Sequence, residues 1–364
     1  MQDFHHLSRI AVALLSRLIA VPSLSREESQ TADIIETFLK EQGCQPFRKG
    51  NNVWVRSFID ARLPVILLNS HHDTVKPVSS WTRNPFEPLI KDGKLYGLGS
   101  NDAGASLVSL MMTFLHYKDR QDRPYNLIYA ATAEEEITGK GGISLIMDDL
   151  GQPDLVIVGE PTQMQMAIAE KGLMVLDCET QGKTGHAARN EGVNAIYPAL
   201  DDIQWFRTFK FPLVSPVLGE VKMTVSVIHA GYQHNIVPDK CTYVVDVRTN
   251  EHYKNTEVLE IIRQHVRYSS VTPRSTHINS SSIPVAHPVI QKGLSMGLGT
   301  YGSPTTSDQA RIPYTSFKIG PGDSARSHTA DEFVYPDEIE KGIAMYIKLL
   351  DGLQISKFQD DRTP

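Results

Sequence analysis

Three apolar runs in the chain each end abruptly in polar and acidic residues. They cover residues 64–68, 126–132 and 154–159. Short apolar runs without polar alternation are typical of strands that are buried on both faces, as in a parallel sheet. In open α/β sheets, ligands bind at the carboxyl ends of such strands. We therefore expect the residues that follow these three runs to meet at one edge of a sheet.

Helical periodicity surrounds these strands. It covers residues 5–20, 27–43, 105–117, 288–297 and 336–350. Ser25 and Glu28 have the spacing of a capping box, which predicts the start of the second helix. A further strand is expected at 315–319. These helices are expected to cover the faces of the sheet.

After about residue 172 the pattern changes to a complete βαββαβ order, the split unit of ferredoxin-like domains. Strands are predicted at 173–180, 220–229, 241–248 and 277–284, and helices at 193–206 and 256–266. We therefore predict an α/β fold: a mixed, mostly parallel sheet flanked by helices, with an inserted ferredoxin-like βαββαβ domain. The catalytic domain would comprise 1–171 and 285–364, and the inserted domain 172–284; a length of 364 residues suits two domains.

Composition narrows the classes of partner. The 36 basic and 42 acidic residues give a net charge of -6, so nucleic acid is a poor candidate partner. Three widely separated cysteines predict neither a disulfide framework nor a thiolate metal site. No apolar run reaches the ~18 residues of a membrane span, and the start of the chain lacks the basic residues of a secretory signal. We expect a cytoplasmic protein.

The first run ends in His71, His72 and Asp73. Residues two apart in an extended segment face the same side, so Asp73 can orient the ring of His71 while His72 points away. Taken alone, such a pair is more often an ordinary loop pair, and the three acids at 134–136 are more often a solvated face. Three runs that deliver such residues to one edge favour a functional site.

The chemistry of the collected residues predicts a metal centre. The candidates are two imidazoles and several carboxylates, without thiolates: His71, Asp73, Asp102, Glu134, Glu135, Glu136, Glu160 and His328. This set suits two divalent cations such as zinc, or cobalt or manganese, and a pair of cations activates water for hydrolysis. A carboxylate outside the ligand set would move the proton. Gly97 and Gly99 would allow a tight turn that holds Asp102 at the strand ends, although an ordinary helix N-cap is an equal alternative for Asp102.

The chain resembles a known family. The motifs are Ser70-His71-His72-Asp73, Gly97 to Asp102, Thr132 to Glu136, Gly159-Glu160-Pro161, Gly185-His186 and His328 to Phe333. Their order is similar to that in the acetylornithine deacetylase, succinyl-diaminopimelate desuccinylase and aminoacylase family of co-catalytic zinc amidohydrolases. The likeness runs over nearly the whole chain. Each motif is weak alone, and together they are specific.

The resemblance implies a role for each matching residue. His71, Asp102 and Glu160 would hold one zinc ion. Asp102, Glu136 and His328 would hold the other, so that Asp102 bridges the two. Glu135 would be the general base and later the acid, and Asp73 would orient His71. The inserted domain would form a homodimer, from which His186 would reach the neighbouring subunit's site and stabilise the oxyanion.

The resemblance also implies substrate contacts. Arg248 matches an arginine that binds a substrate carboxylate, and Asn235 and Thr306 resemble further contacts. An ordinary role at a strand end or turn is equally compatible with each of these three residues. The chain departs from the usual family pattern at Ser70, Leu98 and residues 104–105, which leaves the metal ligands intact and the substrate open.

We therefore expect a metal-dependent amidohydrolase that removes the acyl group of a small N-α-acyl amino acid. N-acetylornithine, in arginine biosynthesis, is the leading substrate. A desuccinylase acting on succinylated ornithine, citrulline or diaminopimelate is the alternative, as is a metallo-dipeptidase. From a different class, the chain could be a non-catalytic metal-binding dimer module, although such a module would have no reason to keep Glu135.

Overall fold

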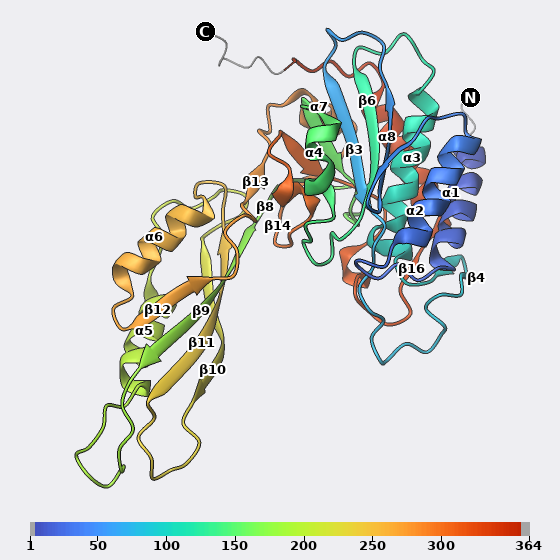
Figure 1. Ribbon diagram of the computed structural model, residues 1–364. Coiled ribbons are helices and arrows are strands. Elements are labelled where there is room, and N and C mark those ends of the chain that lie inside the picture. The colour runs from blue at the N-terminus through green and yellow to red at the C-terminus, as the bar shows by residue number, and fades with distance from the viewer. Residues whose placement is uncertain (1–3, 358–364) are drawn as a thin grey trace. The chain divides into compact units, whose positions relative to one another are not determined.

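The computed structural model describes residues 4–357 (Figure 1). Residues 1–3, at the start of the chain where no secretory signal is expected, and residues 358–364 lie outside this range. The chain divides into two compact units. The second comprises Ala169–Ser282 and Gly302–Thr306, and the first contains the remaining residues. The predicted inserted domain, 172–284, begins and ends within three residues of the longer segment but does not include 302–306.

The first unit is built on a mixed sheet with the order β1-β2-β6-β3-β7-β15-β8. The strands are β1 (Phe47–Lys49), β2 (Asn52–Ser57), β3 (Val65–His71), β6 (Asn126–Thr132), β7 (Leu155–Val158), β8 (Met166–Glu170) and β15 (Ser316–Lys318). The central strands β6, β3, β7 and β15 are parallel to their neighbours in that group, and the pairs outside them are antiparallel. The predicted mixed α/β sheet is therefore confirmed. The strands β13 (Ser281–Ser282) and β14 (Thr300–Ser303) both pair with β8.

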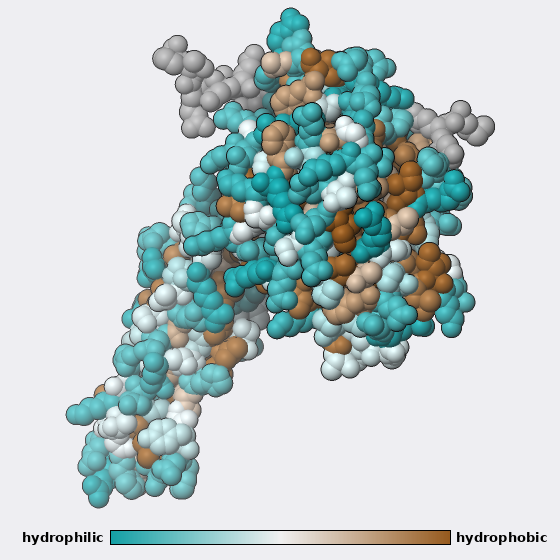
Figure 2. Space-filling model, turned by 45° about the vertical axis from the view of Figure 1, so that its right-hand side comes forward, coloured by the Kyte–Doolittle hydropathy of each residue, from teal (hydrophilic) through white to brown (hydrophobic). Residues whose placement is uncertain are grey.

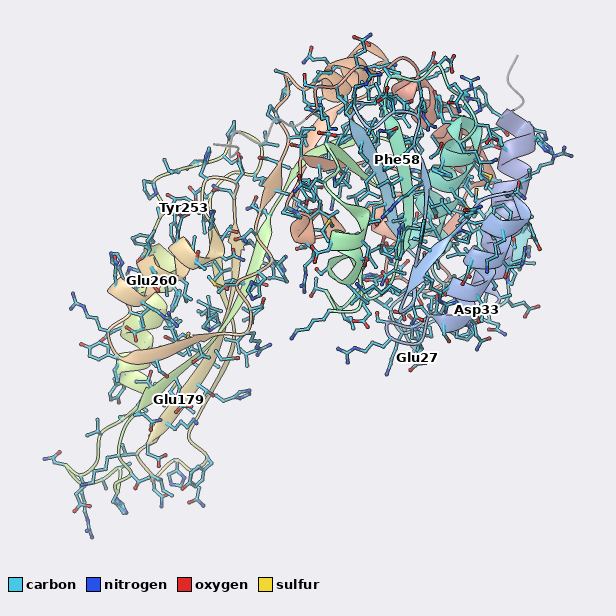
Figure 3. All side chains as sticks on the ribbon, turned by 45° about the horizontal axis from the view of Figure 1, so that its top comes forward. Glu27, Asp33, Phe58, Glu179, Tyr253 and Glu260 are labelled. Carbon is cyan, nitrogen blue, oxygen red and sulfur yellow. The ribbon has the colours of Figure 1, made fainter. Side chains whose placement is uncertain are left out.

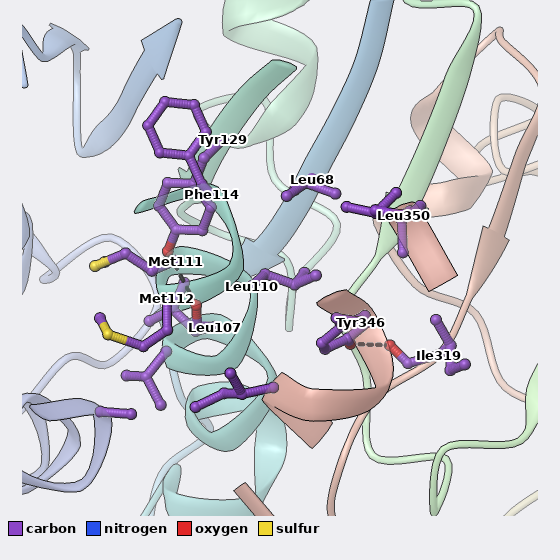
Figure 4. Packing of buried hydrophobic residues seen from close by; sticks show 14 of the residues in the cluster. Leu68, Leu107, Leu110, Met111, Met112, Phe114, Tyr129, Ile319, Tyr346 and Leu350 are labelled. Carbon is purple, nitrogen blue, oxygen red and sulfur yellow. Dashed lines mark hydrogen bonds between the residues drawn. The ribbon is translucent and has the colours of Figure 1, made fainter. Parts of the chain in front are cut away.

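Helices cover both faces of this sheet (Figure 1). On one face lie α1 (Phe4–Ile19), α2 (Ser29–Glu41), α3 (Ala105–Tyr117), α7 (Pro288–Ser295) and α8 (Pro336–Leu350), and α4 (Ile143–Leu150) lies on the other. Each face of the sheet has its own hydrophobic core, and alternate residues of a strand point into one or the other. Ile66 and Leu68 of β3 pack into the larger core, and Leu67 packs into the smaller one with residues of α4. Figure 4 shows part of the larger cluster, with the Tyr346 hydroxyl donating to the Ile319 carbonyl. The uninterrupted apolar runs follow from this burial on both faces.

The second unit is a four-stranded antiparallel sheet with the order β10-β11-β9-β12 and with helices α5 (Ile196–Thr208) and α6 (Asn255–His265). The strands are β9 (Gly172–Gln181), β10 (Lys222–Ala230), β11 (Lys240–Thr249) and β12 (Ser269–Pro273). Glu179 on β9 and Glu260 on α6 mark the sheet and a helix in Figure 3. The chain order βαββαβ confirms the predicted ferredoxin-like unit.

Two local predictions were wrong. The fourth strand of the second unit is β12, not 277–284, because the polar segment Ser269–Pro273 pairs with β9 while Ser281–Ser282 pairs with β8. The Ser25–Glu28 capping box does not form. Glu28 precedes α2 without capping it, and Ser25 donates to Asp73 instead. Among the described residues, no helix is both long and apolar enough to cross a membrane.

The described surface is mostly hydrophilic on the face shown in Figure 2, with apolar residues scattered among polar ones. A small three-stranded sheet, β16-β5-β4, lies in the first unit. Its strands are β4 (Leu89–Lys91), β5 (Lys94–Tyr96) and β16 (Phe333–Val334). The loop before it, within 74–94, is attached through Thr82, whose backbone N–H donates to Asp331 at 3.0 Å. This attachment brings the loop beside the segment that follows His328.

Candidate metal centre

The strand register brings the carboxyl ends of three strands to one edge. β3 pairs in parallel with β6 and β7, with His71 opposite Thr132 and Asn69 opposite Val158. The side chains that follow these ends are therefore neighbours in space, although up to 89 positions separate them in sequence. The edge gathers His71, Asp73, Glu135, Glu136 and Glu160.

The imidazole of His71 is buried and has two different sides. Its Nδ1 lies 3.0 Å from the backbone carbonyl of Asp73 and 3.4 Å from the Asp73 carboxylate. Nδ1 is therefore placed to donate to this carbonyl, which directs Nε2 toward the acidic residues of the edge. Nε2 has no hydrogen-bond partner among the described residues. It faces three carboxylates, with oxygens of Asp102, Glu135 and Glu160 at 3.4, 3.8 and 3.9 Å.

Asp102 lies between the two histidines. Its Oδ1 is 3.4 Å from Nε2 of His71, and its Oδ2 is 3.6 Å from Nε2 of His328. The same nitrogen of His328 lies 3.0 Å from Glu136. One oxygen of the Asp102 carboxylate thus faces His71, and the other faces His328.

A wide turn, Ser100–Gly104, carries Asp102, and α3 begins only after it. Asp102 is therefore not a helix N-cap. Gly97 and Gly99 have φ of 151° and 74°, and a Cβ at Gly99 would lie 2.6 Å from Thr74. The glycines allow the close turn that the sequence predicted.

Asp73 is fully buried, and its carboxylate accepts three hydrogen bonds from residues around the site. One carboxylate oxygen accepts the backbone N–H of Glu135 at 3.0 Å. The other accepts the N–H of Glu136 at 3.2 Å and the hydroxyl of Ser25 at 2.7 Å. The carboxylate of Asp73 therefore fixes the loop that carries both glutamates, while its backbone carbonyl lies at hydrogen-bond distance from the ring of His71.

The electrostatics of this edge favour a bound positive charge. Burial, followed by the charge of Asp102, raises the pKa of Glu160 to about 8, against the opposing effect of His71. Burial also raises the pKa of Glu135 well above its usual value. Burial alone would lower the pKa of His71, but Glu135, Asp102 and Asp73 raise it well above normal. The two imidazoles of His71 and His328 cannot balance all the carboxylates gathered here.

The donor set fits divalent cations. Two groups of residues each have ligand atoms that lie within 4.8 Å of one another. The first is His71, Asp102 and Glu136, and the second is His71, Glu135 and Glu160. Tetrahedral ligands at ~2.0–2.1 Å from a zinc ion are themselves about 3.3 Å apart, close to the spacing of His71 and Asp102. The unpartnered Nε2 of His71 aims at this space. The residues present therefore suit a metal of the zinc, cobalt or manganese type.

Two residues of the predicted motifs have other roles. His72 points away from the edge, as expected: its ring nitrogens lie 2.9 Å from the Thr31 hydroxyl and 2.9 Å from the Asn51 carbonyl. Glu134 holds its own loop, because its carboxylate accepts the backbone N–H of Gly141 at 3.1 Å. Neither residue belongs to the groups of ligand atoms.

Three supporting residues were not predicted from the sequence. Ser25 was assigned to a helix cap. Asp308 is buried and accepts hydrogen bonds from Asn69 at 2.9 Å and Thr132 at 2.7 Å. Glu332 is buried beside Asp102, and burial followed by the charge of Asp102 raises its pKa to about 8. The acidic pair 331–332 after His328 was the only sequence signal for this last residue.

The proposed substrate contacts lie in the second unit. Arg248, near the end of β11, is held by Asp246, with Nε and Nη2 donating at 2.9 and 3.1 Å. Thr306 belongs to the short segment 302–306 of the same unit, and the carbonyl of Ser303 in this segment accepts the N–H of Lys171 next to β9. Arg248 and this segment therefore lie at the same end of the sheet.

His186 and Asn235 lie at the opposite end of that sheet. Residues 186 and 236 form a bridge, and the N–H of Ala187 donates to the Asn235 carbonyl. Lys240, at this end of β11, and Arg248 are eight positions apart, which amounts to about 27 Å of strand. The side chains of His186 and Asn235 are exposed. The structure thus brings His186 and Asn235 together and separates them from Arg248.

A cage of imidazoles and carboxylates at the carboxyl ends of parallel strands defines a metal-dependent hydrolase. Comparison with known proteins agrees. The model of peptidase family M20/M25/M40 matches residues 67–352. The chain belongs to this family of metallohydrolases.

Similar proteins include a desuccinylase, a deacetylase and a peptidase. The chain is 27% identical to a succinyl-diaminopimelate desuccinylase of Stenotrophomonas maltophilia, over 94% of this chain and 98% of that protein. It is 26% identical to an acetylornithine deacetylase of Buchnera aphidicola, over 74% and 75%. A dinuclear metal-binding M20 peptidase of Bacillus subtilis has a similar fold, with a TM-score of 0.71 at 15% identity over 95% and 98% of the two chains.

Proposed function

We propose that the chain removes the acyl group from a small N-α-acyl amino acid, with two divalent cations, zinc in the first place. His71, Asp102 and Glu160 would hold one cation, and Asp102, Glu136 and His328 the other. The observation that carries this proposal is the position of Asp102, with Oδ1 3.4 Å from His71 and Oδ2 3.6 Å from His328. When bound, such a pair lowers the pKa of a water molecule and polarises the scissile carbonyl.

The chain's own groups would move the proton. Glu135 takes a proton from the attacking water and passes it to the leaving nitrogen, so it acts as base and then as acid. Its high pKa, which burial causes, suits a group that must hold a proton between these two steps. Asp73 keeps the backbone of Glu135 in place at 3.0 Å and the ring of His71 in one orientation.

The acyl group has two candidates. N-acetylornithine, in arginine biosynthesis, is the substrate that the sequence resemblance puts first. A specific observation favours a succinyl group: Lys222 stands opposite Arg248 in the β10–β11 register, and Lys171 directly precedes β9 at the same end. Burial, followed by the charges of Lys222 and Arg248, lowers the pKa of Lys171, which places three cations near one another. A substrate with a second carboxylate would match this charge.

We also propose that two copies of the chain form a dimer. Arg248 and His186 lie at opposite ends of the second unit, too far apart to contact one small substrate. If both serve a substrate, His186 must act on the site of another copy, where it would donate to the developing oxyanion. Strand β10 is an unpaired sheet edge that exposes Val227 and Ile228, 42% and 48% accessible, and such edges pair readily.

A hydrolysis panel tests the proposed function. Acetyl and succinyl derivatives of ornithine, citrulline and diaminopimelate, together with simple dipeptides, would be compared by kcat/KM, with bound metal measured on the same sample. We expect one N-acyl amino acid to be favoured and divalent metal to accompany the activity. Preferred cleavage of dipeptides, or full activity after exhaustive metal removal, would contradict the proposal.

A further inference from the structure

Glu332 makes an unusual set of hydrogen bonds for a buried carboxylate. Its Oε1 accepts the backbone N–H groups of Asn101 and Asp102 at 2.8 and 2.9 Å. Its Oε2 accepts the N–H of Gly99 at 3.1 Å. The side chain is only 2% exposed. One carboxylate therefore fixes the backbone of the turn that carries Asp102.

The same residue connects this turn to the segment of His328. Glu332 follows His328 by four positions, and its backbone carbonyl accepts the N–H of Gly97 at 3.0 Å. The next residue, Phe333, pairs with Tyr96 between β16 and β5. Both the backbone and the side chain of Glu332 thus attach the Asp102 turn to the His328 segment.

Correct placement of both ligands is necessary for a shared cation. Ligating groups must be held within about 0.5 Å of their working positions by the residues around them. The turn is glycine-rich, and its backbone N–H groups would otherwise be buried without partners. Oε1 of Glu332 binds the N–H of Asp102 itself, so a displacement of this carboxylate would move Asp102 relative to His328.

We propose that Glu332 is a positioning residue of the metal centre, which fixes Asp102 at the distance from His328 that a shared cation requires. This inference rests on the proposed two-cation centre. It assigns Glu332 no contact with the cation. Glu332 acts through the backbone of Asp102, so its reach should matter more than its charge.

Two variants separate reach from charge. Glu332→Gln keeps the length of the side chain and the oxygen that accepts from Asn101 and Asp102, but it removes the charge and the acceptor for the Gly99 N–H. Glu332→Asp keeps the charge but withdraws the carboxylate by one methylene group. Each apo protein would be titrated with Co²⁺ alone, with affinity measured by chelator competition and ligand geometry by the visible absorption spectrum. We expect about 10–100-fold weaker Co²⁺ binding and an altered spectrum for Glu332→Asp, and affinity closer to wild type for Glu332→Gln.

Asp331→Asn is the matched control. Asp331 is the adjacent carboxylate and binds the N–H groups of Thr82 and Arg83 instead of the Asp102 turn, so Co²⁺ affinity should stay at the wild-type value. Wild-type affinity for Glu332→Asp, or weaker binding by Glu332→Gln than by Glu332→Asp, would overturn the positioning role. Failure of the wild-type protein to bind Co²⁺ at all would instead overturn the proposed metal centre. Only variants whose far-UV circular dichroism spectrum equals that of the wild type are compared, so that unfolding is not mistaken for weaker metal binding.

Discussion

The separation of His186 from Arg248 leads to a complementation experiment. Two inactive variants are prepared: Glu135→Ala, which removes the proposed base, and His186→Ala, which removes the proposed oxyanion donor. Each would be almost inactive alone, because one group is missing from every site. The two are then mixed under conditions that exchange subunits.

The expected recovery follows from the geometry. About 27 Å of β11 separates Lys240, at the His186 end of the second unit, from Arg248. If His186 serves the other copy, a mixed dimer has one site that lacks both groups and one site that is complete. Random exchange makes half of the dimers mixed, so recovered turnover should approach roughly a quarter of the wild-type value. If His186 serves its own chain, every site in the mixture lacks one group and nothing is recovered.

The assay is the rate of deacylation of the best substrate, before and after subunit exchange. His229→Ala changes another exposed histidine of the same unit and serves as a control. This variant should be active alone, without subunit exchange. Light scattering on the same samples reports the oligomer. No gain on exchange between proven dimers, or a fully active monomer, would refute the role of His186 in the neighbouring site.

Three further predictions concern the residues around the metal centre. Asp73→Asn should lower metal affinity by about 10–100-fold, measured by chelator competition, because its amide nitrogen cannot accept a backbone N–H as the carboxylate does; an unchanged affinity would exclude the supporting role. His72→Ala should lower the free energy of unfolding by about 1–3 kcal/mol in urea and leave metal stoichiometry unchanged, because the hydrogen bonds of its ring go to Thr31 and Asn51 and not to the candidate ligands. Ile66→Ala, at a fully buried position, should cost about 2–5 kcal/mol in the same titration, and a cost near zero would contradict the described core.

The parts of the site that follow strands could be predicted from sequence. A buried strand is visible as an apolar run, and its carboxyl end places the next residues at a known edge. This argument reached His71 and Glu160. It also placed His72 on the other side, because side chains alternate along an extended segment.

The supporting residues could not be predicted in the same way. The hydrogen bonds of Glu332 to the Asp102 turn join positions 230–233 apart, so no local spacing reports them. Ser25 and Glu28 show the opposite problem. Their spacing matched a helix cap, but α2 begins only at Ser29, and the Ser25 hydroxyl donates to the buried carboxylate of Asp73. Strand β12 was missed because it is polar and lies at a sheet edge.

The central claim is that a buried cage of imidazoles and carboxylates holds two cations while Glu135 moves the proton. Metal content and turnover, measured on the same samples of wild type and Glu135→Gln, test it most directly. We expect two divalent cations per chain in both proteins, with turnover lowered by about 10²–10⁴-fold in the variant. An active wild-type protein without bound metal, or a Glu135→Gln protein with wild-type turnover, would contradict the claim.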